Sequence, residues 1–156
     1  MLRTIASVFG FIFFLTIAAG YSGAQQIGAV TYEKDVEKIQ SGKCKLCHGS
    51  NSPTIEEFDK DKKGFQKKMK GPRMDTYQNL MVFINGKDAG AIMRRLDDGK
   101  NTKDGQPGNM YRYLGATDSE RAKNLEVYKK WVGGWTLKRK AELTDAEVKA
   151  IKALEK

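Results

Sequence analysis

The sequence contains very little histidine, with a single residue, His48, among 156. One imidazole excludes a zinc site with two or three histidines, an HExxH metalloprotease, and a haem with two histidine ligands from this chain. Cysteine and proline are also scarce, with two and three residues respectively. The length corresponds to one domain with a modest core and is too short for a multidomain enzyme.

The first 24 residues have the layout of a secretory signal peptide. Arg3 provides the positive charge, residues 5–19 form a largely apolar run, and small residues precede Gln25. We expect cleavage before Gln25, because an uncleaved membrane anchor needs about 20 apolar residues. The exported chain, residues 25–156, then has 27 basic and 19 acidic residues and a net charge of +8. After cleavage, stable membrane insertion is not expected.

Both cysteines lie in one motif, Cys44-Lys45-Leu46-Cys47-His48, which also contains the single histidine. The spacing C-x-x-C-H is the attachment signature of c-type haem. In this chemistry the two thiols add to the vinyl groups on one edge of the porphyrin, and the adjacent imidazole binds the iron. The sequence therefore predicts one haem c, attached through Cys44 and Cys47, with His48 as the first axial ligand.

Two other uses of a C-x-x-C pair fit the sequence less well. A redox-active disulfide of the thioredoxin type usually follows a β-strand and begins a helix, and no matching pattern of β-branched runs is present. A zinc site needs two further soft ligands, which the chain does not contain. Haem attachment is therefore the favoured interpretation.

The second axial ligand is expected to be a methionine, because no other imidazole exists and both thiols are used. The exported chain has five candidates, Met69, Met74, Met81, Met93 and Met110. Met81 and Met93 lie in apolar helical patterns, where methionine usually fills the core, and Met69 lies among lysines. Met110 follows a loop rich in Gly, Pro and Asn. We predict Met110 as the ligand, with Met74 as the alternative, since both precede helix starts.

Apolar periodicity and capping residues predict an all-α fold of four to five helices around the haem. The two clearest starts are capping boxes, formed by Thr117 with Glu120 and by Thr144 with Glu147. The polar, lysine-rich residues 49–70 are predicted to form an ordered surface loop or a frayed short helix. The expected helices are residues 31–40, 75–84, 88–96, 117–132 and 144–154.

The haem motif, Gly71-Pro72 and the Met110 loop, in this order, resemble the small class I monohaem cytochromes c. More narrowly, the basic chain with an additional C-terminal helix resembles the PccH-like periplasmic monohaem cytochromes of Geobacter-type bacteria. The resemblance implies that residues 31–40 cross residues 118–132 beside the haem. It also implies that the Pro72 carbonyl accepts a hydrogen bond from His48, which would fix the ring. We expect a single domain over residues 25–156, with the additional helix in 136–156.

With both axial positions filled by the chain, oxygen and peroxide reach the iron only by displacing a ligand. The sequence therefore predicts an electron carrier cycling between Fe(III) and Fe(II) in the periplasm, and not an enzyme. Asp97 and Asp98 are interpreted as ordinary surface charge. The alternative is a ligand-binding or sensory haem protein with an open or labile distal site, which the same attachment motif would serve.

The basic excess favours redox partner proteins with acidic surfaces, although lysines that only keep the protein soluble explain the same charge. Nucleic acid is not expected as a partner, because an exported haem protein has no access to it. Arg94 or Arg95 is a candidate partner for a haem propionate. The aromatic residues that either contact the porphyrin or simply pack in the core are Tyr111, Tyr113, Trp131 and Trp135.

Overall fold

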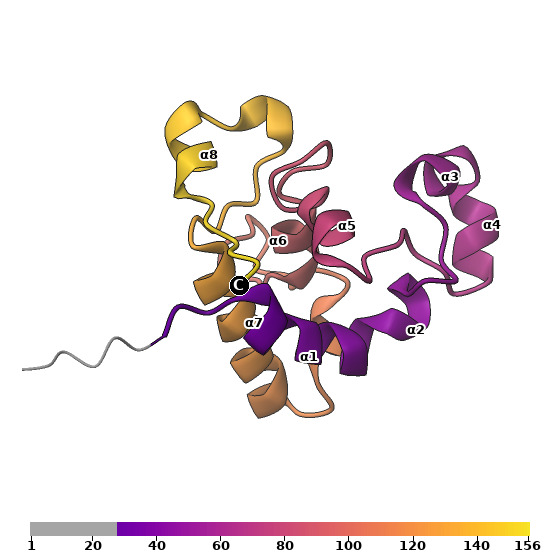
Figure 1. Ribbon diagram of the computed structural model, residues 1–156, viewed down its shortest axis with the longest axis horizontal. Helices are drawn as coiled ribbons and strands as arrows, with labels where there is room; N and C mark the ends of the chain where they lie inside the picture. The colour runs from indigo at the N-terminus through magenta and orange to yellow at the C-terminus, as the bar shows by residue number, and fades with distance from the viewer. Residues whose placement is uncertain (1–27) are drawn as a thin grey trace, which may run out of the picture.

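The computed structural model describes residues 28–156, so the predicted signal peptide and its cleavage site lie outside the described residues. Within this range the regular structure is helical (Figure 1). Gly133 and Ile151 also form an isolated antiparallel β-bridge. The prediction of an all-α fold is confirmed, although the helices are shorter and more numerous than expected. No helix among the described residues is long and apolar enough to cross a membrane.

A continuous helical segment, called here the N-terminal segment, runs from Tyr32 to His48. Thr31 caps its start, because its hydroxyl accepts a hydrogen bond from the Lys34 N–H. The sequence predicted an end at Gln40, but a π-helical segment over Gln40–Cys44 carries the helix through Gly42 into the haem motif. Its successive parts are η1 (Tyr32–Val36), α1 (Glu37–Ile39), η2 (Gln40–Cys44) and α2 (Lys45–His48).

The lysine-rich region predicted as a loop or frayed helix instead forms two short helices, α3 (Ile55–Lys60) and α4 (Lys62–Lys67), at one end of the molecule (Figure 1). Each has its own N-cap, provided by the side chains of Thr54 and Asp61. The rings of Phe58 and Phe65 stack with their centroids 6.2 Å apart. Local caps and one aromatic pair therefore order a region that lacks enough apolar residues for a core of its own.

Two short helices in the middle of the chain, α5 (Tyr77–Met81) and α6 (Ala91–Leu96), contribute to the core. The start of α5 is capped by Thr76, whose hydroxyl accepts from the Asn79 N–H, and not by Asp75 as predicted. Helix α6 begins later than predicted, because Gly90 immediately before it has a positive φ of 76°. A positive φ is readily adopted by glycine and interrupts a right-handed helix.

The longest helix is α7 (Asp118–Val132), whose predicted buried stripe is confirmed. Leu125, Tyr128, Trp131 and Val132 are all buried in the core. Helix α7 contacts η1 of the N-terminal segment, and the rings of Tyr32 and Trp131 lie 6.1 Å apart. The expected packing of residues 31–40 against residues 118–132 is therefore present.

The two predicted capping boxes differ in the structure. The box of Thr144 and Glu147 is complete and starts α8 (Asp145–Ala150). At the start of α7, Thr117 accepts from the Glu120 N–H, but the Glu120 carboxylate accepts from the Ala116 N–H, one residue before the cap. The carboxylate therefore binds the main chain one residue before the cap, and the reciprocal pattern of a capping box is not formed.

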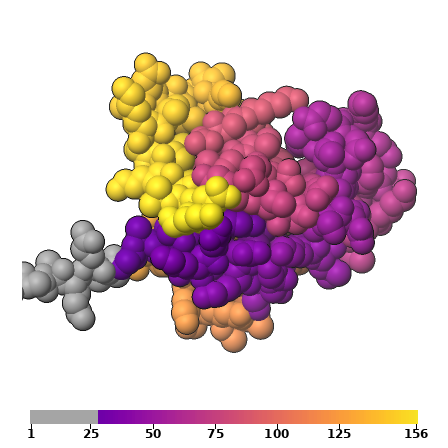
Figure 2. Space-filling view, in the orientation of Figure 1, coloured from indigo at the N-terminus to yellow at the C-terminus, as the bar shows by residue number. Residues whose placement is uncertain are grey.

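The chain after α8 does not continue the predicted helix to Leu154. It turns back toward the N-terminal segment after the short helices η4 (Lys140–Glu142) and α8, and Figure 2 shows this tail lying against that segment. The Leu154 carbonyl accepts hydrogen bonds from the Trp131 indole at 2.7 Å and from the Tyr32 N–H at 2.9 Å. The C-terminal residues therefore fasten the N-terminal segment to α7.

Candidate haem-binding site

The imidazole of His48 is held by a hydrogen bond to the main chain. Its Nδ1 atom lies 2.7 Å from the carbonyl oxygen of Pro72, the contact that the resemblance implied. Because a carbonyl can only accept, Nδ1 carries the proton and donates it. In this tautomer Nε2 has a free lone pair and is therefore the atom that can bind a metal ion.

Main-chain hydrogen bonds hold the segment that contains Pro72 against the haem motif. The Gly71 N–H donates to the Cys47 carbonyl at 2.8 Å, and the Met74 N–H donates to the His48 carbonyl at 2.9 Å. The Ser52 hydroxyl donates to the same Cys47 carbonyl at 2.9 Å. The position of the Pro72 carbonyl, and with it the orientation of the imidazole, is thus set by backbone geometry.

Gly71 lies directly against the His48 ring. A Cβ atom built on Gly71 would be 2.6 Å from Nδ1 and 2.8 Å from Nε2, and closer still to Cε1. These distances are shorter than any ordinary van der Waals contact, so the ring has this position only because residue 71 lacks a side chain. Glycine here makes a cradle for the imidazole on one side.

The surroundings of the motif favour a neutral His48 imidazole, the form that binds a metal ion. Burial lowers the pKa of His48 below its usual value, while the hydrogen bond to Pro72 acts in the opposite direction. Burial also raises the pKa of Cys44 to about 11, an effect that contact with Tyr128 partly offsets. Redox-active C-x-x-C motifs have a cysteine with a lowered pKa, so the environment of Cys44 argues against the thioredoxin-like alternative.

A buried polar atom without a partner lies near the first cysteine. Gln40 is 1% exposed, and its Oε1 has no hydrogen-bond partner. Gln40 and Cys44 both neighbour the buried Tyr128 hydroxyl. This oxygen is an acceptor and a haem offers it no N–H donor, so it does not bear on the choice of cofactor. The groups that fit a covalently attached haem are the two thiols and the imidazole with a free Nε2.

The candidate methionines have different environments. Met93 is fully buried in the core and Met69 is 76% exposed. Met74 is buried, and its main chain is bound to that of His48. Met110 is partly buried against the core, at the end of the Gly-, Pro- and Asn-rich loop. Its N–H donates to the Arg95 carbonyl at 3.0 Å, which ties the loop to the end of α6.

The interpretation of Asp97 as surface charge is wrong, because this residue is 0% exposed. Its carboxylate accepts hydrogen bonds from the Trp135 indole at 2.9 Å and from the Gly99 N–H at 2.9 Å. Asp98, which is partly buried, forms ion pairs with Lys100 and Lys129. An Asp at a helix end followed by a Gly-containing turn is a pattern that side-chain-to-backbone bonding favours, so the sequence did carry a signal.

The arginines and tryptophans considered as haem contacts have partners within the chain. Arg94 donates to the Lys138 carbonyl at 2.8 Å, and Arg95 donates to the Asn109 side chain at 3.0 Å. Trp131 is in the core and donates to Leu154. The burial and hydrogen bond of Trp131 therefore agree with core packing, one of the two roles expected for this residue.

A family model described as PccH cytochrome c matches residues 31–156. The chain belongs to this PccH cytochrome c family. It is similar to the solved structure of the monoheme cytochrome PccH from Geobacter sulfurreducens, with 47% identity and a TM-score of 0.77. That match covers 81% of this chain and 99% of the PccH chain. Among curated proteins, no sequence matches.

Membership in the PccH family confirms a cytochrome c-like fold and one covalently attached haem c. Cys44 and Cys47 are the two cysteines of the chain and form the attachment motif with His48. A monohaem cytochrome c family supports haem electron transfer as the general function.

Replacing Gly71 by alanine tests the cradle around His48. The new Cβ would force the imidazole away from its position, at a cost of about 1–3 kcal/mol in folding free energy. We expect Gly71→Ala to reduce the haem attached per polypeptide and to alter the ferric spectrum. Gly42→Ala is the control, because nothing lies within 4 Å of a Cβ at that position. Identical spectra and unfolding midpoints for the two variants would contradict the role of Gly71.

Proposed function

We propose that this protein is a periplasmic electron carrier whose haem iron is bound by His48 and Met110. The observation that carries the proposal is the His48 tautomer, since Nδ1 donates to Pro72 and leaves Nε2 for iron within a C-x-x-C-H motif. When bound, haem c supplies a reversible one-electron change between Fe(III) and Fe(II). The chain supplies the axial ligands and the surroundings that exclude other chemistry.

The environments of the methionines support Met110 as the second ligand. Met74 is anchored through its main chain to His48 itself, on the histidine side of the site. Met93 is engaged in the core and Met69 faces solvent. Met110 is partly buried against the core at the end of an irregular loop, a position that suits a ligand supplied by the chain to a cofactor.

Rigid placement of His48 suits electron exchange. The imidazole is held by the Pro72 carbonyl on one atom and rests against Gly71. A ligand that the protein holds in place needs little rearrangement when the charge of the iron it binds changes. A thioether as the other ligand favours the reduced iron relative to a second imidazole, so the pair His48 and Met110 raises the reduction potential.

Replacement of Met110 tests the ligand assignment. In the ferric wild-type protein we expect a weak far-red charge-transfer band from sulfur bound to iron, and Met110→Ala should lose this band and become high-spin. Met74→Ala is the control, which should keep the band while losing about 2–5 kcal/mol of stability as a buried core residue. Rapid binding of carbon monoxide to the reduced wild-type protein would instead indicate a ligand-binding or sensory protein.

Export and processing are tested by mass. The proposed location requires removal of residues 1–24 and attachment of one haem outside the cytoplasm. We expect protein purified from the periplasmic fraction to have the mass of residues 25–156 plus one haem. A mass that includes the first 24 residues would contradict cleavage, and a mass without added haem would contradict attachment.

The basic charge is concentrated around the haem motif, in residues 43–70, called here the lysine lobe. This lobe has eight lysines and four acidic residues, a net charge of +4. Leu46, the central apolar residue of the motif, is 84% exposed within it. An exposed apolar residue surrounded by positive charge suits docking of a redox partner with an acidic surface.

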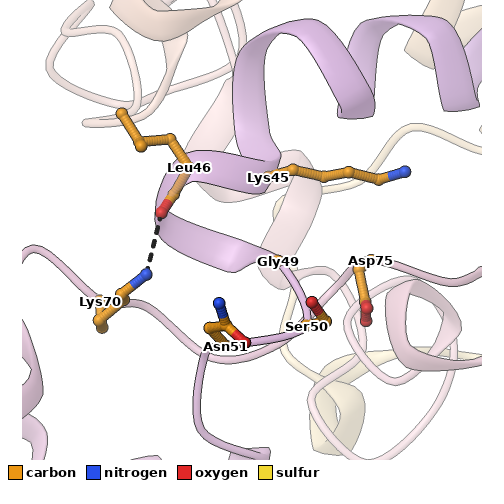
Figure 3. A pocket seen from close by; sticks show the side chains of 7 residues that line it. All are labelled: Lys45, Leu46, Gly49, Ser50, Asn51, Lys70 and Asp75. Atoms are coloured by element: carbon orange, nitrogen blue, oxygen red, sulfur yellow. Dashed lines mark hydrogen bonds between the residues drawn. The ribbon is translucent and has the colours of Figure 1, made fainter.

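A pocket of about 380 Å³ lies mostly within the lysine lobe, against α2 (Figure 3). Across it, the ammonium group of Lys70 donates to the Leu46 carbonyl at 3.2 Å. Its lining is partly polar and partly apolar and includes neither cysteine nor His48, so we assign it to the surface offered to a partner. The lining residues are Lys45, Leu46, Gly49, Ser50, Asn51, Lys70 and Asp75.

Charge reversal on the lysine lobe tests the docking surface. We expect Lys67→Glu/Lys68→Glu to slow oxidation of the reduced protein by ferricyanide, an anion, by about tenfold at low ionic strength. The control, Lys123→Glu/Lys130→Glu, makes the same charge change on exposed positions of α7. Stopped-flow rates measured against salt concentration compare the two. Equal slowing in both variants would show that only net charge matters.

A further inference from the structure

Asp97 is a fully buried carboxylate that the haem-binding site described above does not use. Both of its oxygens are saturated with donors. Oδ1 accepts from the main-chain N–H groups of Gly99 at 2.9 Å and Asn101 at 3.2 Å. Oδ2 accepts from the Asn101 side-chain amide at 2.8 Å and from the Trp135 indole at 2.9 Å. Buried charge is costly, and this set of donors offsets the cost.

The loop that carries Met110, residues 97–110, is closed around Asp97. Its last part returns to its start, because the Gly108 N–H donates to the Asp97 carbonyl at 2.8 Å. Within the loop, the Thr102 hydroxyl contacts the carbonyls of Gly99 and Gln106 at 2.9 and 3.0 Å. Asp97 therefore binds the first turn through its side chain and the final turn through its main chain.

Asp97 also connects this loop to the helix beside the haem motif. Its partner Trp135 lies just beyond the end of α7, after Gly133 and Gly134, and the Lys129 ammonium lies 5.8 Å from the centroid of the Trp135 ring. Helix α7 contributes the Tyr128 hydroxyl that neighbours Cys44. The hydrogen bond between Asp97 and Trp135 thus links the Met110 loop to the helix that lies over the first cysteine.

We propose that Asp97 is a positioning residue, whose carboxylate holds the loop so that Met110 stays at the iron. The inference rests on the proposed ligation by His48 and Met110. Its physical basis is that a ligand on an irregular loop keeps its place only if the loop itself has one conformation. The four donors around Asp97 provide that restriction, and no other buried carboxylate among residues 28–156 is bonded in this way.

The role requires an ionised carboxylate and not only a side chain of this shape. Burial acts to raise the pKa of Asp97, but hydrogen bonds from Asn101, Trp135 and Gly99 lower it below its usual value. An amide in place of the carboxylate would turn an NH₂ group toward N–H donors. Asp97→Asn therefore breaks the contacts at one oxygen without creating a large cavity.

The experiment compares three variants of the ferric holoprotein, using imidazole as the competing ligand. In Asp97→Asn we expect a weakened far-red band and at least tenfold tighter imidazole binding, since two hydrogen bonds are lost at one oxygen and each bond to a charged group corresponds to about one order of magnitude. Trp135→Phe, which removes one donor, should give a smaller shift in the same direction. Asp145→Asn removes the same charge from an exposed position of α8, away from the loop, and should match the wild-type protein in both measurements.

Each outcome separates the inference from the proposal on which it rests. A wild-type protein without the far-red band overturns ligation by Met110, and the role of Asp97 with it. A wild-type protein with the band, and an Asp97→Asn variant that matches Asp145→Asn, overturns only the role of Asp97. If Asp97→Asn does not fold, Trp135→Phe decides, because unchanged imidazole affinity in that variant contradicts the proposal.

Discussion

The hydrogen bond from His48 to the Pro72 carbonyl is the interaction on which the rest of the site depends. It fixes the tautomer of the imidazole, and so it determines that Nε2 is the atom available to iron. It also fixes the direction of the ring, which rests against Gly71. The bond exists because main-chain contacts hold residues 71–74 against Cys47 and His48. A flexible imidazole would bind iron less firmly and permit competing ligands.

The larger fold keeps this site in place by joining the two ends of the chain. Helix α7 packs on the N-terminal segment and buries Tyr128 next to Cys44. The C-terminal tail then bonds to both, because the Leu154 carbonyl accepts from Trp131 and from Tyr32. The haem motif lies at the other end of the same helical segment, so this fastening reaches it through the helix. Family membership over residues 31–156 covers all of these parts.

Some helices were predictable from the sequence around them, while the ends of others depend on contacts with distant parts of the chain. The buried stripe of α7 was predictable, since its apolar spacing matches one helix face. Residues 49–70 were predicted only as an ordered loop or a frayed short helix, because the order of α3 and α4 comes from caps and one aromatic pair and not from apolar periodicity. The helix expected to reach Leu154 ends at Ala150, where bonds to the rest of the protein outweigh helical propensity.

The sequence by itself determined the cofactor chemistry. Two thiols and one imidazole within five residues specify covalent haem attachment, since this chemistry depends on spacing along the chain. Only the tertiary structure decided which distant groups support it. Pro72 lies 24 residues from His48, and Trp135 lies 38 residues from Asp97. Such pairs meet because helices pack and loops close around them, and chain spacing alone does not specify which buried donor meets which acceptor.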